Sequence, residues 1–194
     1  MKRSLFALAL AAALPLSAQA GELSYNYIQL EYNRVSIDGF DDFDADPDGF
    51  GLKGSAALGE QFYLFGSYMS LSDTIAGFDV DYDQSQVGLG FRHGISEKAD
   101  FLAEISYLNA DIEVEDEGSF GGDGYRASVG VRGLMASNFE GYAKANWTDG
   151  GDVDGTFSGT IGALFKINQT WGINAEAEFG EDATVWGLGV RASF

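Results

Sequence analysis

The feature that most constrains the fold is a two-residue alternation of apolar and polar side chains, which recurs from residue 27 to the end of the chain. In Tyr27–Asn33, Ile28 and Leu30 alternate with Gln29 and Glu31. Successive side chains of a strand point to opposite faces, so this pattern indicates a strand with one apolar and one polar face. Comparable segments lie at 50–58, 62–71, 86–92, 101–108, 126–132, 140–147, 160–167, 172–179 and 185–194. In 62–71 both faces are apolar, so the sequence leaves the orientation of that strand open.

The lengths of these segments and of their connectors point to a membrane barrel. A tilted membrane strand needs about 9–11 residues. The short connectors are 59–61, 94–99, 136–138 and 168–170, and the longer, acidic ones are 37–48, 72–81, 115–124 and 149–155, with a shorter fifth at 180–183. Short turns at one rim and long loops at the other are typical of outer-membrane barrels. We therefore predict an all-β, antiparallel transmembrane β-barrel of about ten strands, with eight as the runner-up and a soluble exported β-sandwich as the alternative fold.

The first twenty residues have the features of a secretory signal peptide. Lys2 and Arg3 precede a short apolar run at 5–14, and Ala18-Gln19-Ala20 is a small-x-small cleavage site. We expect cleavage after Ala20, which divides the chain into a signal peptide at 1–20 and a barrel domain at 21–194. No later stretch approaches the ~18 apolar residues of a membrane-spanning helix.

Charge is distributed unevenly between strands and connectors. The chain has 11 Lys+Arg, 30 Asp+Glu and a net charge of −19, which argues against nucleic-acid binding. It has no Cys, so a disulfide scaffold and a thiol nucleophile are excluded. Most bases fall on the polar strand faces, whereas most acids fall in the connectors. The charged residues on the polar faces are Glu31, Lys53, Arg92, Glu104, Arg126, Arg132, Glu140, Lys144, Lys166, Glu176, Glu178 and Arg191.

These twelve residues predict a polar lumen that is filled by its own side chains. A barrel of about eight strands leaves room for side chains only, and open porins have about 16–18 strands. Charges in a medium of low dielectric constant must pair, and bases and acids are nearly balanced in this set. We expect a plugged lumen with little or no conductance, and a small diffusion channel is the alternative.

Catalytic residues are not apparent in the sequence. Hydrolysis at the outer rim would need a general base close to a nucleophile or an activated water. The only histidine, His93, precedes a short connector, and its parity directs it toward lipid at the periplasmic rim. We expect a protein that is not an enzyme. An outer-rim hydrolase or a lipid A-modifying enzyme is the less favoured alternative.

One acidic connector has the spacing of a partial calcium loop. Asp44, Asp46 and Asp48 are followed by Gly49, as in the first half of an EF-hand loop. The match fails at the twelfth position, where Ser55 replaces the bidentate Glu. We expect no cofactor beyond a weak association of Ca²⁺ or Mg²⁺ with the acidic loops, and ordinary solvation of these acids is the alternative.

The last strand resembles the assembly signal of bacterial outer-membrane proteins. The matching residues are Trp186, Leu188, Val190 and Phe194, whereas Ala192 is smaller than the usual bulky residue. The whole plan is similar to small OmpA/OmpX-like barrels. Met1–Ala20 and Leu23–Ile28 also resemble small xanthomonad outer-membrane barrels once described as quorum-sensing or plant-immunity factors.

The resemblance implies a location and a set of partners. The location is the bacterial outer membrane. The partners are membrane lipid with lipopolysaccharide, and the barrel assembly machinery, which reads the terminal strand in that family. The function we expect is envelope-structural or surface-interaction, of the adhesion, biofilm or signalling type, with acidic extracellular loops and no identified extracellular partner.

Overall fold

The computed structural model describes residues 23–37, 46–75, 78–114, 118–151 and 153–194. The predicted signal peptide lies outside these residues, as does Asp44. Every regular element among the described residues is a β-strand. The described chain includes no helix with the length and apolar character needed to cross a membrane.

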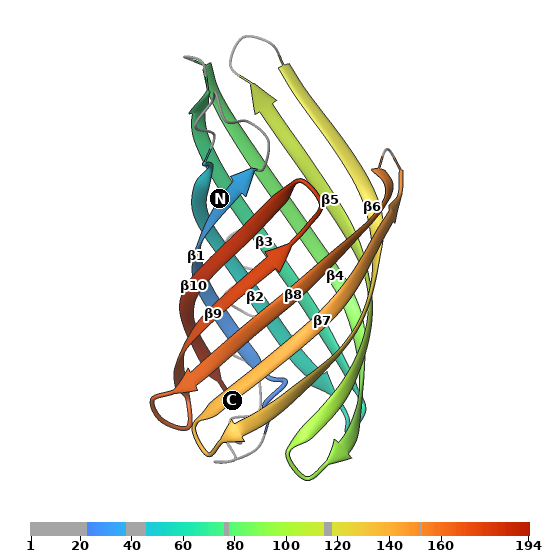
Figure 1. Cartoon of the computed structure of the whole chain (residues 1–194), viewed down its shortest axis with the longest axis vertical. Helices are drawn as coiled ribbons and strands as arrows, with labels where there is room; N and C mark the ends of the chain where they lie inside the picture. Colours follow the sequence, from blue (N-terminus) through green and yellow to red (C-terminus); the bar gives the residue numbers. More distant parts are fainter. Residues whose placement is uncertain (1–22, 38–45, 76–77, 115–117, 152) are drawn as a thin grey trace, which may run out of the picture.

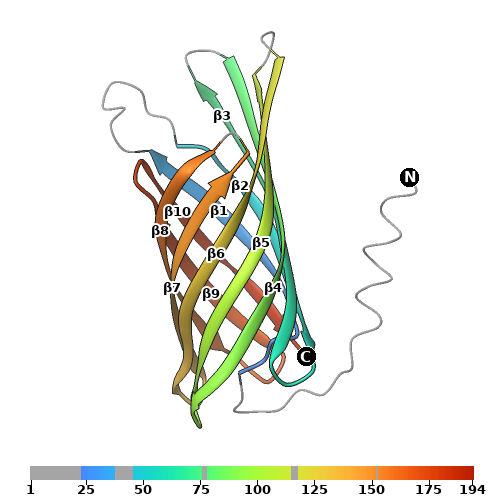
Figure 2. The same cartoon turned by 90° about the vertical axis from the view of Figure 1, so that its right-hand side faces the viewer.

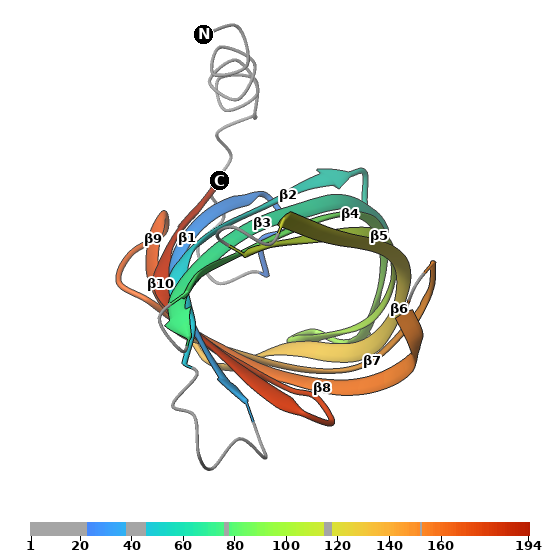
Figure 3. The ribbon, with the colours of Figure 1, turned by 90° about the horizontal axis from the view of Figure 1, so that it is seen from above.

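The strands form one closed antiparallel barrel (Figures 1 and 3). They are β1 (Tyr27–Ile37), β2 (Asp48–Leu58), β3 (Phe62–Ile75), β4 (Phe78–Ser96), β5 (Ala99–Val114), β6 (Gly118–Ala136), β7 (Phe139–Gly150), β8 (Val153–Lys166), β9 (Trp171–Phe179) and β10 (Ala183–Ser193). Each strand pairs with its neighbours in sequence, and β1 pairs with β10 to close the ring. The prediction of ten strands is confirmed, and the runner-up of eight is wrong.

The strand register sorts the side chains into a polar interior and an apolar exterior. On β1, Gln29, Glu31 and Asn33 are at most 2% exposed, whereas the intervening Leu30 is 57% exposed. Outward-facing apolar side chains on other strands include Leu52, Leu64, Val87, Ile105, Val129, Ile161, Ile173 and Leu188. Transfer of each such side chain from water to an apolar medium is favourable by about 1.5–3 kcal/mol. This inside-out polarity is that of a transmembrane barrel, as the alternation predicted.

Strand β3 shows how pairing settles an orientation that local sequence left open. Tyr63 and Leu71 face the interior and are 4% and 2% exposed, whereas Phe62, Leu64 and Tyr68 face outward. The register places Ser67 of β3 between Lys53 of β2 and Gln86 of β4, which fixes the odd-numbered residues of β3 on the polar side. Both faces are apolar because the inward-facing Tyr63, Phe65 and Leu71 fill space within the lumen.

Three of the predicted acidic loops are largely strand, which corrects the sequence reading. The connector expected at 72–81 contains the ends of β3 and β4, the one at 115–124 contains the start of β6, and the one at 149–155 contains the ends of β7 and β8. Strands β3 to β6 rise well above the rest of the barrel (Figure 2). Acidic residues alternate with apolar ones there, as in Asp79-Val80-Asp81-Tyr82-Asp83. This alternation permits a strand, although charge density alone suggested a loop.

The opposite rim carries the short turns and both ends of the described chain. The turn after β2 contains Gly59 with φ of 88°, a left-handed conformation that glycine adopts without strain. The connector expected at 94–99 shortens to residues 97–98, because β4 extends through a register shift between Gly94 and Ser96. The amide of Phe194 donates to the carbonyl oxygen of Asn26 at 2.9 Å, which ties the two ends together.

Candidate functional site

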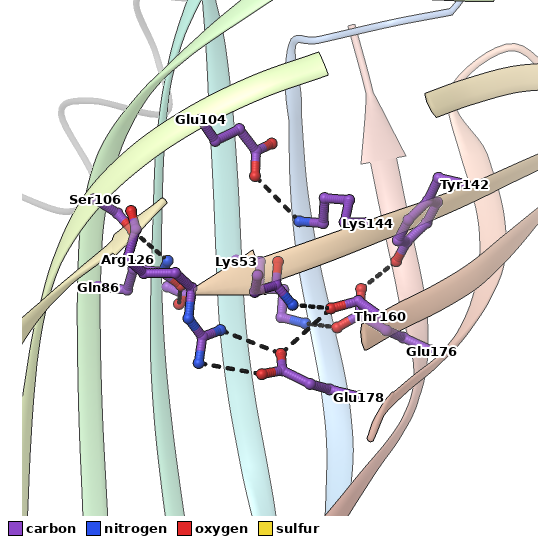
Figure 4. A network of polar contacts seen from close by, with 12 residues as sticks. Lys53, Gln86, Glu104, Ser106, Arg126, Tyr142, Lys144, Thr160, Glu176 and Glu178 are labelled. Carbon is purple, nitrogen blue, oxygen red and sulfur yellow. Dashed lines mark hydrogen bonds and ion pairs between the residues drawn. The ribbon is translucent and has the colours of Figure 1, made fainter. Parts of the chain in front are cut away.

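The structure directs all twelve charged residues of the predicted lumen set into the barrel interior. They lie on nine of the ten strands, at the positions whose side chains point into the barrel. Because side chains of a strand alternate between its two faces, their position in the sequence is enough to place them inside. Lys53 is at the centre: its Nζ lies 2.7 Å from Oε1 of Glu31. The same Nζ lies 2.7 Å from Oε1 of Glu176 (Figure 4). Tyr142 also donates a hydrogen bond to Glu176. These contacts join β1, β2, β7 and β9 across the lumen.

Further ion pairs fill the lumen above and below this centre. Arg126 contacts Glu178 at 3.1 Å, and Lys144 contacts Glu104 at 3.2 Å (Figure 4). Glu140 is 1% exposed and lies between two bases, Arg132 at 2.6 Å and Lys166 at 2.5 Å. Each carboxylate thus compensates the desolvation of at least one cation, as a barrel interior of low dielectric constant requires.

Arg191 is held without a carboxylate in direct contact among the described residues. Its Nε donates to Oε1 of Gln29 at 2.7 Å, and its guanidinium lies 4.0 Å from the ring centroid of Tyr27. The amide nitrogen of Gln29 in turn donates to Glu31 at 2.6 Å. The neutral Gln29 therefore links Arg191 to Glu31 through two hydrogen bonds.

The sequence reading missed Asp100 as a member of the lumen set. Its carboxylate lies 3.8 Å from Arg92 and accepts a 2.8 Å hydrogen bond from the hydroxyl of Tyr25. Asp100 has the same parity on β5 as Glu104, so extending the alternation by four residues toward the N-terminus would have found it. With Asp100 the lumen set contains six acids and seven bases, which makes this set nearly neutral.

The sequence reading also missed the aromatic plug at the short-turn end of the lumen, although Tyr25 has the same parity as Gln29 and Glu31. Tyr25 precedes β1 and is 4% exposed, and it packs against Tyr63 with 4.8 Å between the ring centroids. The guanidinium carbons of Arg92 and Arg132 lie 4.5 and 4.8 Å from the centre of the Tyr25 ring. Burial raises the pKa of the Tyr25 hydroxyl, which therefore stays protonated and donates to Asp100. Tyr25 is thus bound to β3, β4, β5 and β6 at once.

The remaining internal space is small. A cavity of about 140 Å³ lies among the charged side chains, and Lys53, Glu104, Arg126, Glu176 and Arg191 are among its lining residues. Inward-facing glycines make room for the bulky groups around it. A Cβ at Gly90 would lie 2.1 Å from Cζ of Tyr63, and one at Gly162 would lie 2.2 Å from Cζ of Tyr142. The space left by these glycines is occupied by tyrosine rings.

Two other sequence-predicted sites lie outside the lumen. His93 is exposed, two residue pairs from the β4–β5 turn, and its strand partner is Phe101. Asp46 forms an ion pair with Arg34, and its backbone N–H donates to Asp73 at 3.0 Å. Within the described ranges no group of three His, Cys, Asp or Glu residues is arranged to hold a metal ion.

The predicted assembly signal lies on the outer face of the closing strand. Trp186, Leu188 and Val190 of β10 are 50%, 61% and 47% exposed and point away from the lumen. Phe194 directly follows the strand at the short-turn rim. These residues therefore present an apolar row toward lipid.

Comparisons with known proteins bear on the fold. No protein-family model matches the sequence, and the search of curated proteins found no match. The translocator domain of the autotransporter NalP from Neisseria meningitidis is similar over 100% of this chain and 95% of its own, with 10% identity and a TM-score of 0.51. The KdgM porin is 13% identical over 86% of this chain and 99% of its own, with a TM-score of 0.45. Ail, the attachment invasion locus protein of Yersinia pestis, is 18% identical over 89% of this chain and 100% of its own, with a TM-score of 0.40.

The fold is that of bacterial outer-membrane β-barrels. Together with the apolar exterior and the polar lumen, it places the chain in a bacterial outer membrane.

Proposed function

We propose that this protein is a non-enzymatic outer-membrane barrel with a closed lumen, whose role is to present a surface for interaction outside the cell. The observation that carries the proposal is a four-stranded extension of the barrel. We define the extension as Leu71–Ile75 of β3, Phe78–Tyr82 of β4, Ile112–Val114 of β5 and Gly118–Phe120 of β6. The extension stands beyond the ends of the other strands (Figure 2). A plugged barrel does not need such an extension for transport.

The two faces of the extension differ in chemistry. Its outward face carries the acids Asp79, Asp81 and Glu113, and it adjoins the outward-facing Asp111, which directly precedes Ile112 on β5. Its inward face carries mainly apolar side chains, with Asp73 of β3 as an exception: Ile112 of β5 pairs with Tyr82 of β4 and Phe120 of β6, and Phe120 is 64% exposed. This polarity is the reverse of that in the membrane-spanning part, where the exterior is apolar. An exposed apolar face beside an acidic one is a surface suited to a macromolecular partner.

The extension also has an open edge. Strand β6 first pairs with β7 at Tyr125. Among the described residues, the backbone edge of Gly118–Gly122 that faces away from β5 therefore pairs with no strand. The unpaired N–H and C=O groups of such an edge can pair with an extended polypeptide. The charge of the outward face favours a partner with basic side chains.

An attachment assay tests this proposal. We would express the protein in bacteria that lack other adhesins and measure attachment to a surface coated with polylysine. Changing Asp79, Asp81, Asp111 and Glu113 to their amides should lower attachment several-fold, because the acidic face is lost. The matched control is Glu97→Gln, an acid in a turn at the opposite rim. Equal attachment of the two variants would contradict the proposed surface role.

The alternative of a small diffusion channel is favoured only by the 140 Å³ cavity. The ion pairs around this cavity and the Tyr25 plug support a conductance that is absent or small. Planar-bilayer recording distinguishes the two functions: stable nanosiemens steps would show an open channel and overturn the closed-lumen proposal.

The absence of enzymatic activity is part of the proposal. An outer-rim hydrolase would lose activity in the double variant Asp79→Asn, Asp81→Asn, whereas a binding surface has no turnover to lose. A lipid A-modifying activity would appear as a mass change in lipid A extracted from cells that express the protein, and we expect no such change.

Several partners belong to the same proposal. They are lipopolysaccharide and other membrane lipid, the barrel assembly machinery acting on Trp186, Leu188, Val190 and Phe194, and weakly held Ca²⁺ or Mg²⁺ near the acidic residues. The narrower resemblance to the xanthomonad barrels rests on the sequence at 1–28, and it is consistent with a role at the cell surface.

A further inference from the structure

The free edge of β6, at Gly118–Gly122, has a defined set of backbone donors and acceptors. This part of β6 stands above the β7–β8 hairpin (Figure 1). Further along the strand, the amide of Leu134 donates to the carbonyl oxygen of Lys98 at 2.8 Å, and the β5–β6 register runs without a shift from there to the rim. Even-numbered residues of β6 therefore turn their backbone groups toward β5. Because successive residues of a strand alternate in this respect, Ser119 and Gly121 each present an N–H and a C=O group at the free edge.

Carboxylates crowd the outward side of the strands next to this edge. Asp111 of β5 lies directly opposite Asp83 of β4, and Glu113 lies directly opposite Asp81. Like charges at opposed positions of a sheet repel each other, which is destabilising. Among the described residues, no Lys or Arg faces outward from a strand between β3 and β7. A basic side chain that reaches these acids would therefore relieve a repulsion that the described part of the chain leaves uncompensated.

The residues of β6 leave these acids accessible from the free edge. Asp111 pairs with Gly121, and Glu113 pairs with Ser119, so only small side chains stand between the acids and the edge. The Asp111 carboxylate occupies the space that a side chain at Gly121 would need. It therefore lies over β6, on the side of the edge. A strand added to β6 would lie about 4.8 Å away, within reach of a long basic side chain.

The inward side of the same edge is apolar. Phe120 is 64% exposed, and its partner Ile112 on β5 is 40% exposed. Phe120 lies between Ser119 and Gly121 in the sequence. In an added strand, the residue opposite Phe120 would point to the same side as its ring. An apolar side chain at that position would cover Phe120 and Ile112, which removes apolar surface from water.

We propose that the free edge of β6 binds an extended segment of another protein in which an apolar residue has a Lys or Arg on each side. The first basic residue pairs with Ser119 and contacts Glu113. The second pairs with Gly121 and contacts Asp111, and the apolar residue between them packs on Phe120. This assignment rests on the proposed surface role of the extension and gives the chemistry of its partner. A second copy of the chain does not fit, because its edge would bring a second set of carboxylates.

Fluorescence anisotropy tests the proposal with the full barrel in nanodiscs of phosphatidylcholine and with EDTA present. The probe is a short labelled peptide in which lysine and valine alternate. The comparison peptide has the same composition with its lysines and valines in separate blocks. The alternating peptide should bind about tenfold more tightly, because only alternation directs every base to one side of a strand. Equal binding of the two peptides would show that charge alone attracts them and would overturn the proposal.

The substitution Ser119→Pro tests the backbone edge. Proline removes the N–H group that faces the free edge but none that bonds to β5, so the barrel should still fold. It should weaken binding of the alternating peptide about tenfold, because a hydrogen bond of the added strand is lost. The matched control Ser119→Val keeps the N–H group and should bind like the unchanged protein. The double variant Asp111→Asn, Glu113→Gln should also weaken binding, because the contacts to the lysines are lost.

The outcomes separate strand addition from the proposed surface role. If the double acid variant loses the peptide and Ser119→Pro does not, the acidic face binds by charge alone, so strand addition is wrong and the surface role remains. If neither variant weakens binding, the acidic surface holds no basic partner and both proposals fail. If the unchanged protein self-associates and Ser119→Pro abolishes this, the edge is an interface between copies and the proposed partner is wrong. A shift on unheated gels checks that each variant is folded.

Discussion

At the scale of single residues, the lumen is stabilised by compensation of charge rather than by apolar packing. Lys53 contacts two carboxylates, and Glu140 contacts two bases. Removing one member of a buried pair leaves the other desolvated and uncompensated, which is more damaging than losing an exposed pair. The alternation of the sequence identified these residues, because parity alone directs a side chain inward. It could not identify their partners, because those partners come from strands far apart in sequence.

The substitution Glu140→Gln measures this compensation directly. It keeps the size of the side chain but removes the carboxylate that contacts Arg132 through two hydrogen bonds. We expect the free energy of unfolding to fall by about 3–5 kcal/mol, as for a buried ion pair that loses one partner. Urea titration of protein refolded into lipid vesicles is the measurement. Glu97→Gln, in an exposed turn, should stay within about 0.5 kcal/mol of the unchanged protein. A similar small effect of Glu140→Gln would show that its charge is not needed.

Gly162, which faces the lumen, and Gly159, which faces outward on the same strand β8, give a matched test of space in the lumen. A Cβ at Gly162 would lie 2.2 Å from the Tyr142 ring, whereas one at Gly159 meets no atom within 4 Å. Gly162→Ala should destabilise the barrel by about 1–3 kcal/mol through overpacking. Gly159→Ala should be neutral or stabilising, because alanine has less backbone freedom to lose on folding. The same urea titration compares the two, and equal effects would argue against a tightly filled lumen.

At the scale of elements, a segment outside the strands closes one end of the barrel. Leu23 and Tyr25 pack with Tyr63 and Leu102, and the Tyr25 hydroxyl reaches Asp100 on β5. The segment alternates Leu23 and Tyr25 with Ser24 and Asn26. Its apolar residues have the parity of the polar, inward-facing Gln29 and Glu31, so the rule that polar side chains face the lumen did not indicate an interior position for them. The extension was mispredicted for a different reason. Its acidic residues suggested loops, whereas its two-residue alternation of acidic and apolar side chains forms strands.

Removing the plug should open a path for small ions. In Tyr25→Ala the aromatic contact with Tyr63 is lost, and so are the contacts of the Tyr25 ring with the guanidinium groups of Arg92 and Arg132. We expect planar-bilayer currents to become more frequent and larger than those of the unchanged protein. Phe62→Ala, which removes an outward-facing ring at the same end, is the control and should leave the currents unchanged. Unaltered currents in Tyr25→Ala would mean that the ion pairs alone close the lumen.

At the scale of the whole molecule, closure decides stability. A barrel has no free edge along its membrane-spanning part, so every backbone group there pairs with a neighbouring strand. The pairing of β1 with β10 over eleven residue pairs completes the ring. Such closed barrels unfold as a unit, and this cooperativity is visible on gels.

Outer-membrane fractions should show heat-modifiable migration of this protein in SDS. We expect the unheated, closed barrel to migrate differently from the boiled chain, because detergent cannot bind the strands while they are paired. A protein found soluble in the periplasm, with no such shift, would contradict the membrane barrel and the proposals that depend on it.

The local alternation of apolar and polar residues was enough to predict the strands, the twelve charged residues of the lumen and the transmembrane-barrel fold. This is because the face to which a strand side chain points depends only on whether its position is odd or even along the strand. Closure was needed for the rest. The orientation of β3, the partner of each charge and the contacts of the plug at Tyr25 all depend on which strands lie side by side and in what register. These contacts join residues remote in sequence, so their geometry is set when the ring closes.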